Sequence, residues 1–269
     1  MAIVASYPDT MPEDMAEEIM ARGILPLSGI GDALAALDVA AGLGVEKPVP
    51  QPLFLPGADA PGQVLGEAEA KGILSGFGVP VPRLVRAESA AAAGRGAAEL
   101  GFPVVLKGEG LAHKTEAGAV VLNLESVEAV EKAAQDMAAE SFLVEEMVPG
   151  AVGELLIGVT LDPAHGFLLT LGAGGTLAEV MADRVSLLLP VTEKDVVEAL
   201  GQLAYAKVLA GYRGASAADI GAIAAAVLAV QDYVVAHREV VLEVEVNPLI
   251  VTPTGAVAVD ALIRVKEEI

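Results

Sequence analysis

Short aliphatic runs alternate with Ala-rich segments of helical spacing along most of this 269-residue chain. "FPVVL" (102–106) and "AVVLNL" (119–124) have the length and the Val and Leu content of buried strands, whereas "VEAVEKAAQDMAAE" (127–140) repeats its apolar residues with a helical period. Hydrophobic residues make up 54% of the chain but aromatic residues only 3%, so the core must consist of Val, Leu, Ile and Ala. These features predict a mixed α/β (α+β) fold.

Changes in composition divide the chain into four parts. Residues 1–46 have a β-α-β-α pattern, which is too small to close a sheet alone. Residues 47–65 are rich in proline and nearly uncharged, as in an extended linker. Residues 66–142 and 143–269 are expected to form the two lobes of the main domain.

The second lobe has longer strand segments than the first. Residues 153–175 are expected to form a hairpin that turns at Asp162-Pro163, and the last strands are joined by a turn at 252–255. Two Ala-rich helices, at roughly 193–209 and 216–236, separate these strand pairs. Strand pairs joined by tight turns indicate an antiparallel sheet.

The charge and the cysteine content exclude several classes of function. A formal net charge of −21 opposes binding to nucleic acids and to anionic membranes. An anionic ligand such as a nucleotide therefore needs local donors and a metal ion. The chain has no cysteine, which excludes disulfides and thiolate chemistry. Neither a membrane span nor a signal peptide is visible, so a cytoplasmic protein is expected.

The loop "KGEGLAHKTEAG" (107–118) nearly spells a phosphate-binding P-loop. That motif needs a glycine directly before its lysine, where the backbone wraps a phosphate, but His113 stands there. The loop is also followed by a strand rather than a helix, so the P-loop interpretation fails. What remains is a glycine-punctuated loop with one imidazole and two ammonium groups, Lys107 and Lys114. A solvated surface turn is an alternative.

Oxygen ligands gather near the C-terminus. Glu243, Glu245 and Asn247 alternate on one face of "LEVEVN", and Asp260 lies in the returning strand. Carboxylate and amide oxygens are the ligands that suit Mg²⁺ carrying phosphates. Glu245, Asn247 and Asp260 are therefore candidate metal ligands, and a solvated strand face is the alternative.

Two further features are weaker indications of an anion-binding site. The turn "GAGG", with Gly172, Gly174 and Gly175, is a candidate phosphate loop, although a plain tight turn fits it equally well. Arg213 has a glycine two positions before it and another directly after it, which favours anion contact close to the backbone, or else a helix end.

Six segments, taken together, resemble the ATP-grasp portion of the nucleoside-diphosphate-forming acyl-CoA synthetases. That group includes ADP-forming acetyl-CoA synthetase and, more distantly, succinyl-CoA synthetase. The segments cover roughly residues 66–265 in the family's order. They are "GEAEAKGILSGFGVPVP", "GFPVVLKGEGLAHKTEAGAVVLNL", "FLVEEMVPGAVGELLIGVTLDPAHG", "LGAGGTLAEVMADRVSLLLP", "LAGYRG" and "EVEVNPLIV…GAVAVDALI". The resemblance implies a two-lobed ATP-grasp fold that follows the last piece of a flavodoxin-like CoA-ligase domain.

The resemblance also implies roles for individual residues in binding ATP and Mg²⁺. Lys107 would contact the nucleotide phosphates, and His113 would carry a phosphoryl group from the nucleotide to a distant acyl-CoA site. Lys114 would help to offset the charge of phosphoryl transfer. The remaining roles are adenine contact for Glu145, Glu146, Met147 and Val148, ribose contact for Glu154, and Mg²⁺ coordination for Glu245, Asn247 and Asp260.

The chain departs from the family pattern in two ways. Ala119 stands where the family loop has a second glycine, which puts full activity in doubt. The CoA-binding domains are absent, so a CoA-binding domain or an alpha-type subunit would have to come from elsewhere, and a homo- or hetero-oligomer is expected. The resemblance thus implies the ATP-binding part of an ADP-forming acyl-CoA ligase. The ATP-grasp part of a protein lysine acetyltransferase, or a nucleotide-sensing or scaffolding subunit, are the alternatives.

Overall fold

The computed structural model describes residues 2–42, 61–109, 119–175 and 183–267. The chain divides into two compact units, Met1–Val49 and Pro50–Ile269, and each is described here by itself.

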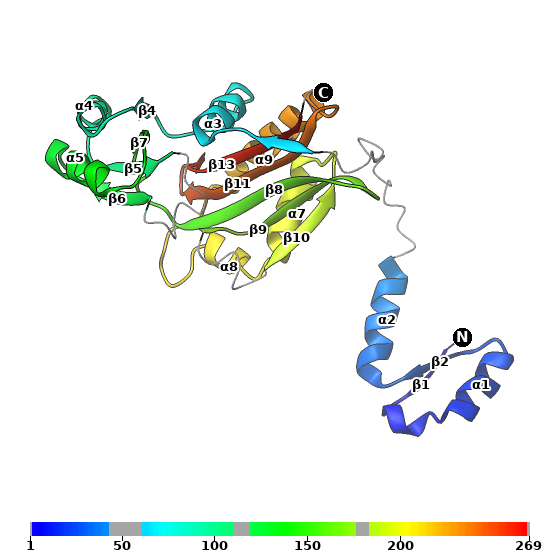
Figure 1. The fold of residues 1–269 in the computed structure, drawn as a ribbon. Coiled ribbons are helices and arrows are strands. Elements are labelled where there is room, and N and C mark those ends of the chain that lie inside the picture. The colour runs from blue at the N-terminus through cyan, green and yellow to red at the C-terminus, as the bar shows by residue number, and fades with distance from the viewer. Residues whose placement is uncertain (1, 43–60, 110–118, 176–182, 268–269) are drawn as a thin grey trace. The chain divides into compact units, whose positions relative to one another are not determined.

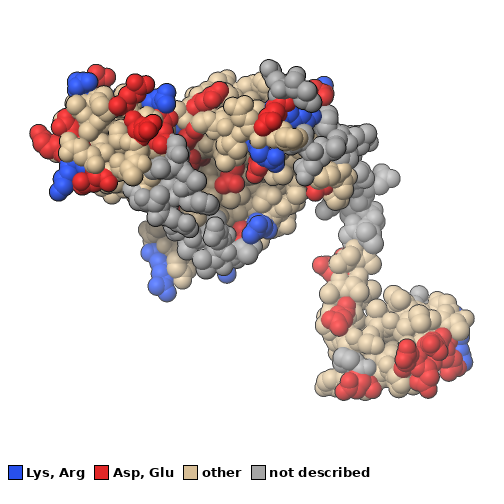
Figure 2. Space-filling model, viewed as in Figure 1, with Lys and Arg blue, Asp and Glu red and all other residues tan. Residues whose placement is uncertain are grey.

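The N-terminal unit has the predicted β-α-β-α order (Figure 1). Strand β1 (Ala2–Ala5) pairs in parallel with β2 (Leu25–Ser28), and a short 3₁₀ turn, η1 (Pro8–Thr10), precedes the first helix. Helix α1 (Glu13–Ala21) connects the two strands, and α2 (Ile30–Gly42) follows β2. Acidic side chains gather on this unit (Figure 2), because the polar residues of α1 are almost all carboxylates.

The small lobe of the second unit is a four-stranded antiparallel sheet in the order β4-β7-β5-β6. Its strands are β4 (Leu84–Ala87), β7 (Phe142–Glu146), β5 (Val104–Gly108) and β6 (Val120–Leu124). Helices α4 (Ala90–Leu100) and α5 (Val127–Asp136) pack against each other and against this sheet (Figure 1). Each helix begins after a serine, Ser89 or Ser126, whose hydroxyl accepts a backbone N–H of the first turn at 3.2 Å.

The large lobe is built on a seven-stranded sheet in which all pairings are antiparallel. The order along it is β10-β9-β8-β11-β13-β3, and β12 also pairs with β11. The strands are β10 (Arg184–Leu188), β9 (Gly166–Ala173), β8 (Gly153–Asp162), β11 (Val241–Thr252), β13 (Ala261–Lys266), β3 (Gly62–Val64) and β12 (Gly255–Ala258).

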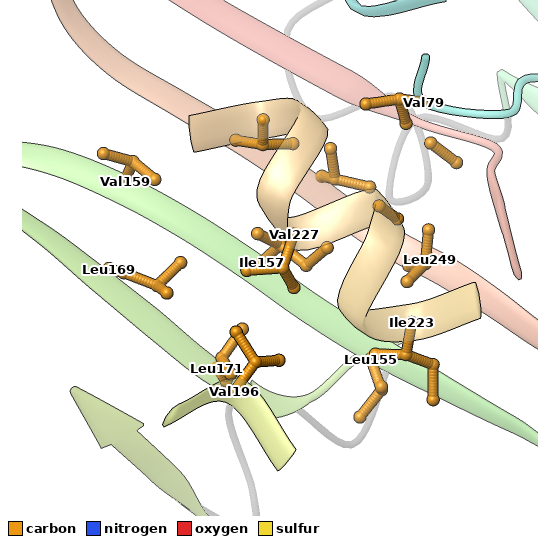
Figure 3. Packing of buried hydrophobic residues seen from close by; sticks show 14 of the residues in the cluster. Val79, Leu155, Ile157, Val159, Leu169, Leu171, Val196, Ile223, Val227 and Leu249 are labelled. Atoms are coloured by element: carbon orange, nitrogen blue, oxygen red, sulfur yellow. The ribbon is translucent and has the colours of Figure 1, made fainter. Parts of the chain in front are cut away.

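Helices α3 (Glu67–Gly76), α7 (Glu193–Gln202), α8 (Ala206–Leu209) and α9 (Ile220–Ala236) complete the large lobe. Figure 3 shows Ile223 and Val227 of α9 over Leu155 and Ile157 of β8. Alternate residues of β8 are buried, as expected for a strand with one face on the core. The Ala-rich sequence of α9 brings its backbone close to the sheet, so the core needs few aromatic side chains. Among the described helices, none combines the length and the apolar character needed to span a membrane.

Both hairpin predictions are confirmed. Asp162 pairs with Gly166 where β8 turns into β9, and Thr252 pairs with Gly255 where β11 turns into β12.

The helix predicted at 193–209 is instead two helices, α7 and α8. The Asp183 carboxylate accepts the backbone N–H groups of Ala204 at 2.9 Å and of Tyr205 at 2.7 Å. A continuous helix would use these two donors internally, so their capture by Asp183 ends α7.

The lobe boundaries also differ from those expected at 47–65, 66–142 and 143–269. Strand β3 lies within the predicted linker and pairs with β13 of the large lobe. Helix α3 was placed in the first lobe, but Ala70 and Leu74 are buried in the core of the large lobe. Conversely, all of β7 belongs to the sheet of the small lobe.

Two Val→Ala substitutions test the assignment of the core. Val227 on α9 is fully buried, whereas Val197 on α7 is 42% exposed, so Val227→Ala should be the more costly change. Both positions are helical, so the change in helix propensity cancels between them. We expect Val227→Ala to lower the free energy of unfolding by about 2 kcal/mol more than Val197→Ala, measured by chemical denaturation. Equal losses would contradict the packing of α9 on the sheet.

Candidate active site at the junction of the lobes

Four charged side chains meet where the two lobes join, and we call them the ionic cluster: Glu67, Lys71, Lys107 and Glu145. Lys71 is fully buried, and the other three are at most 7% exposed. Side chains of these types are rarely buried unless they are paired.

The local structure explains how each charge reaches the cluster. Glu67 and Lys71 are four residues apart on α3, so they share one face of that helix. Lys107 on β5 pairs in register with Leu143 of β7, which makes Glu145 its diagonal neighbour on the same face of the sheet. The large lobe therefore supplies Glu67 and Lys71. The small lobe supplies Lys107 and Glu145.

The two ammonium groups share the same acceptors. Lys107 Nζ donates to Glu67 Oε1 at 2.7 Å and to the Val259 carbonyl at 2.6 Å, and it lies 3.2 Å from Glu145 Oε2. Lys71 Nζ donates to the same Glu67 oxygen at 2.9 Å, to the same carbonyl at 3.2 Å, and to the other oxygen of Glu145. Every proton of Lys71 therefore has a partner, and the cluster has no net charge.

Lys107 keeps its charge in this buried position. Burial by itself lowers the pKa of Lys107, but the nearby carboxylates of Glu145, Glu67 and Asp260 outweigh burial and raise its pKa above the ordinary value. Lys107 is therefore a cation at neutral pH, as a phosphate ligand must be.

The predicted adenine contacts begin at Glu145, which is buried with its two carboxylate oxygens on the lysines of the cluster. The chain then leaves the cluster through the other three, Glu146, Met147 and Val148. Glu146 accepts the backbone N–H of Arg83 at 2.9 Å and pairs with its guanidinium at 2.8 Å. The Arg83 backbone N–H has the largest effect on the pKa of Glu146 and lowers it. Partial burial opposes this, and the Arg83 guanidinium lowers the pKa further, so that the pKa lies below its ordinary value. Met147 and Val148 are half-buried, and the Met147 N–H donates to the Pro103 carbonyl at 3.3 Å.

The glycine turn after β9 lies against two other predicted site residues. The N–H of Gly174 donates to the Glu154 carbonyl at 2.9 Å, and the N–H of Gly175 donates to Asn247 Oδ1 at 2.9 Å. A Cβ on Gly174 would lie 2.5 Å from the Leu155 backbone, and one on Gly175 would collide with the Glu154 carboxylate. Only glycine permits these approaches, so the turn does bring Gly175, Glu154 and Asn247 together. Gly172 lies in β9, against the Asp183 carbonyl.

The predicted metal ligands are also close to one another. Asn247 Nδ2 lies 3.3 Å from Glu245 Oε1, and the Asn247 N–H donates to the Asp260 carbonyl at 3.2 Å. Among the described residues no three His, Cys, Asp or Glu side chains gather as a metal site, so a site here would need the amide of Asn247 as well. Two carboxylates and an amide are oxygen ligands of the kind that Mg²⁺ prefers. The chemistry of these three residues therefore fits Mg²⁺.

Other predicted residues lie apart from this site or outside the described residues. Arg213 is in an exposed turn with a φ of 54°, and its guanidinium lies over the ring of Tyr212, 5.2 Å from the ring centre. No contact within the described part of the chain connects it with the glycine turn. His113 and Lys114 lie outside the described residues.

The sequence analysis missed Glu67, Lys71 and the Val259 carbonyl. Ala70 and Leu74 of α3 are buried, and the spacing places Glu67 and Lys71 on that same apolar face. Two opposite charges on the apolar face of a helix were therefore a visible signal. The carbonyl has no sequence signal, since any residue could supply it.

Residues 58–265 match the ATP-grasp domain family. The chain belongs to the ATP-grasp family. The predicted two-lobed α+β fold and the resemblance to ADP-forming acetyl-CoA synthetases are thereby confirmed.

Curated relatives differ in how much of them this ATP-grasp chain spans. It is 35% identical over 216 residues to the acetate–CoA ligase [ADP-forming] II subunit beta of Pyrococcus furiosus, covering 74% of this chain and 91% of that subunit. It is 34% identical over 232 residues to the trans-feruloyl-CoA synthase FCS1 of an unknown prokaryotic organism, covering 80% of this chain but 32% of that protein. The chain therefore spans nearly a whole beta subunit but about a third of a longer relative.

Solved structures show the same fold. The dinucleotide forming acetyl-coenzyme A synthetase 1 of Ca. Korarchaeum cryptofilum, in complex with coenzyme A and Ca-AMPCP, matches with a TM-score of 0.71 and 33% identity over 76% of this chain and 94% of that one. Another structure of that protein, with a TM-score of 0.67, 33% identity, and coverage of 76% and 93%, holds coenzyme A and Mg-AMPPCP. Its phosphohistidine segment points towards the nucleotide-binding site.

Adjacent glutamates on β7 test the ionic cluster. Glu145→Gln leaves two buried ammonium groups with one carboxylate and should lower the free energy of unfolding by about 3 kcal/mol or more. Glu146→Gln breaks a pair in which the Arg83 side chain is 64% exposed, and this change should cost less than about 1 kcal/mol. Chemical denaturation of both variants checks the difference. If Glu145→Gln were as mild as Glu146→Gln, the buried pairing would be wrong.

Proposed function

We propose that this chain is the ATP-binding and phosphoryl-transfer part of an ADP-forming acyl-CoA synthetase. The overall reaction would convert a carboxylate, CoA and ATP into acyl-CoA, ADP and phosphate. The observation that carries the proposal is that residues 245–260 connect both halves of the site: Asn247 contacts the glycine turn, and the Val259 carbonyl contacts Lys107. An ammonium group, a glycine turn and oxygen ligands are thus connected around one junction.

The nucleotide would lie at this junction, with its base at the segment that follows β7. Met147 and Val148 are half-buried and would contact the adenine, and the neighbouring Glu146 is fixed by Arg83. Glu154 would accept hydrogen bonds from the ribose hydroxyl groups. Lys107 would donate to the phosphates, and the close approach of Gly174 to β8 supports a role for the glycine turn beside them.

Glu245, Asn247 and Asp260 would hold Mg²⁺ with the phosphates. The ion would offset the negative charge that develops on the transferred phosphoryl group. With a net charge of −21, the chain cannot attract ATP by its overall field, so this local compensation is necessary.

His113 would accept the γ-phosphoryl group. A neutral imidazole nitrogen attacks the γ-phosphorus, the bond from phosphorus to the β,γ-bridging oxygen breaks, and ADP leaves with that oxygen. The phosphohistidine would then transfer its phosphoryl group to an oxygen of the carboxylate substrate, which frees the imidazole and forms an acyl phosphate. The CoA thiol would attack the acyl carbon, and phosphate would leave with that oxygen to give acyl-CoA. The phosphohistidine segment of the Korarchaeum relative supports this role for the loop. Lys107 and Lys114 would offset charge during the transfer.

A partner would supply the CoA-binding site, as the similarity to a protein named as a beta subunit suggests. The N-terminal unit supports this, because most of the exposed large apolar side chains lie between residues 3 and 39. The β1–β2 pair is also a small parallel sheet, and such sheets are usually covered on both faces. We propose a CoA-binding subunit or domain as the occupant of this surface.

Two glutamates on the same face of β11 test the metal assignment. Glu245→Gln should weaken Mg²⁺-dependent ATP binding by roughly tenfold or more, because it removes a charged ligand. Glu243→Gln should leave binding within about twofold, because Glu243 pairs with Arg264 at 2.9 Å instead. Calorimetric titration with ATP, with and without Mg²⁺, makes the comparison. Equal effects of the two changes would contradict the assignment.

The chain has three histidines, His113, His165 and His237, which allows a matched test of the phosphoryl carrier. With γ-labelled ATP and Mg²⁺, we expect acid-labile, alkali-stable labelling of the wild type and no labelling of His113→Ala. His165→Ala should keep the label, since His165 is exposed and bonded to Asp162 in the β8–β9 turn. A chain that binds ATP but is never labelled, even with a CoA-binding partner present, would be a binding module only.

A further inference from the structure

The two lysines of the ionic cluster differ in what they can do. They share Glu67 Oε1 and the Val259 carbonyl as acceptors, and each contacts one oxygen of Glu145. The side chain of Lys71 is 0% exposed, whereas that of Lys107 is 8% exposed. Of these two lysines, only Lys107 is therefore in contact with solvent.

Lys107 cannot be fully bonded to the cluster and also donate freely to phosphates. An ammonium group has three protons, and in this structure Glu67 and Val259 accept two of them while Glu145 lies within ion-pair distance of the third. A phosphate that binds Lys107 must therefore compete with protein oxygens. The strength of that competition depends on how well the carboxylates are neutralised without Lys107.

We propose that Lys71 and Glu67 are positioning residues that set how readily Lys107 exchanges its cluster partners for the phosphates of ATP. This proposal rests on the function proposed above. Lys71 stays in place as the resident counterion of Glu67 and Glu145. Glu67 acts in the opposite sense, because it holds Lys107 back through the 2.7 Å hydrogen bond.

The two residues should therefore have opposite effects. Without Lys71, two buried carboxylates depend on Lys107 alone, and an unpaired buried charge is costly, so Lys107 is held more firmly. Without the Glu67 charge, Lys107 loses one carboxylate partner while Lys71 still neutralises Glu145, so Lys107 is released more easily. Removing both charges leaves Lys107 paired with Glu145, with Asp260 acting on it as in the wild type.

The test compares ATP with adenosine, which lacks phosphates, by calorimetric titration of the full chain in Mg²⁺. Lys71→Met should weaken ATP binding by roughly five- to tenfold, and Glu67→Gln should strengthen it by roughly two- to fivefold. The double variant K71M/E67Q should return to within about twofold of the wild type. Adenosine affinity should stay within about twofold in all three variants, because Lys107 does not contact the nucleoside.

A loss of stability would not change ATP affinity in opposite directions in the two single variants. Both single changes unbalance a buried cluster, so damage to the fold would lower ATP affinity in both, and it would affect adenosine as well. If Lys71→Met does not fold, two results still test the proposal: the stronger ATP binding of Glu67→Gln and the nearly wild-type ATP affinity of the double variant. Weaker or unchanged ATP binding in Glu67→Gln would overturn the proposal while leaving the ATP-binding function intact. A wild-type chain that binds neither ATP nor adenosine would overturn the proposed function itself, and this inference with it.

Discussion

The pairing of four buried charges is the constraint on which the junction of the lobes depends. Lys71 has no exposure at all, so the lobes can meet here only if Glu145 of the small lobe reaches it. Buried ion pairs often stabilise a protein no more than apolar side chains of similar volume would, although removing one partner is costly. Stability alone therefore does not account for this cluster. Its position, at the point where the lobes and the proposed phosphate ligand Lys107 meet, indicates a role in ligand binding.

A single stretch of backbone connects this cluster with the proposed metal ligands. Val259 offers its carbonyl to both lysines, and Asp260, the next residue, contacts Asn247 through its own carbonyl. Asn247 in turn accepts the N–H of Gly175. A displacement of the turn between β12 and β13 would therefore alter the environment of Lys107 and the metal ligands at once. This connection would place the proposed phosphate binding and metal binding under one structural constraint, which suits a reaction that needs both together.

Periodicity and turn residues were enough to predict much of the fold. The hairpins at Asp162 and at Thr252 carry local signals, since proline or glycine marks each turn. The break between α7 and α8 was missed because its cause is a side chain, Asp183, that is distant in sequence. The lobe that holds α3 was missed for a similar reason, because an amphipathic helix does not reveal which sheet it covers. In the site, alternation along β11 pointed to Glu245 and Asn247, but the partners of Lys107 come from other elements and only their tertiary arrangement identifies them.

The distribution of charge explains why the cluster is built from matched pairs. Acidic residues outnumber basic ones by 37 to 16, and red patches of Asp and Glu are more extensive than blue ones in Figure 2. A free lysine at the junction would be surrounded by competing carboxylates, whereas Lys107 has defined partners, and Lys71 would remain as their counterion if Lys107 turned to a ligand. In the proposed exchange one ammonium group moves over a short distance, and Lys71 stays in contact with both carboxylates, which then carry one negative charge more than it can balance. In a low-dielectric junction uncompensated charges interact far more strongly than in water. The counterion that Lys71 provides would therefore affect how readily an anionic ligand can take Lys107 from its partners.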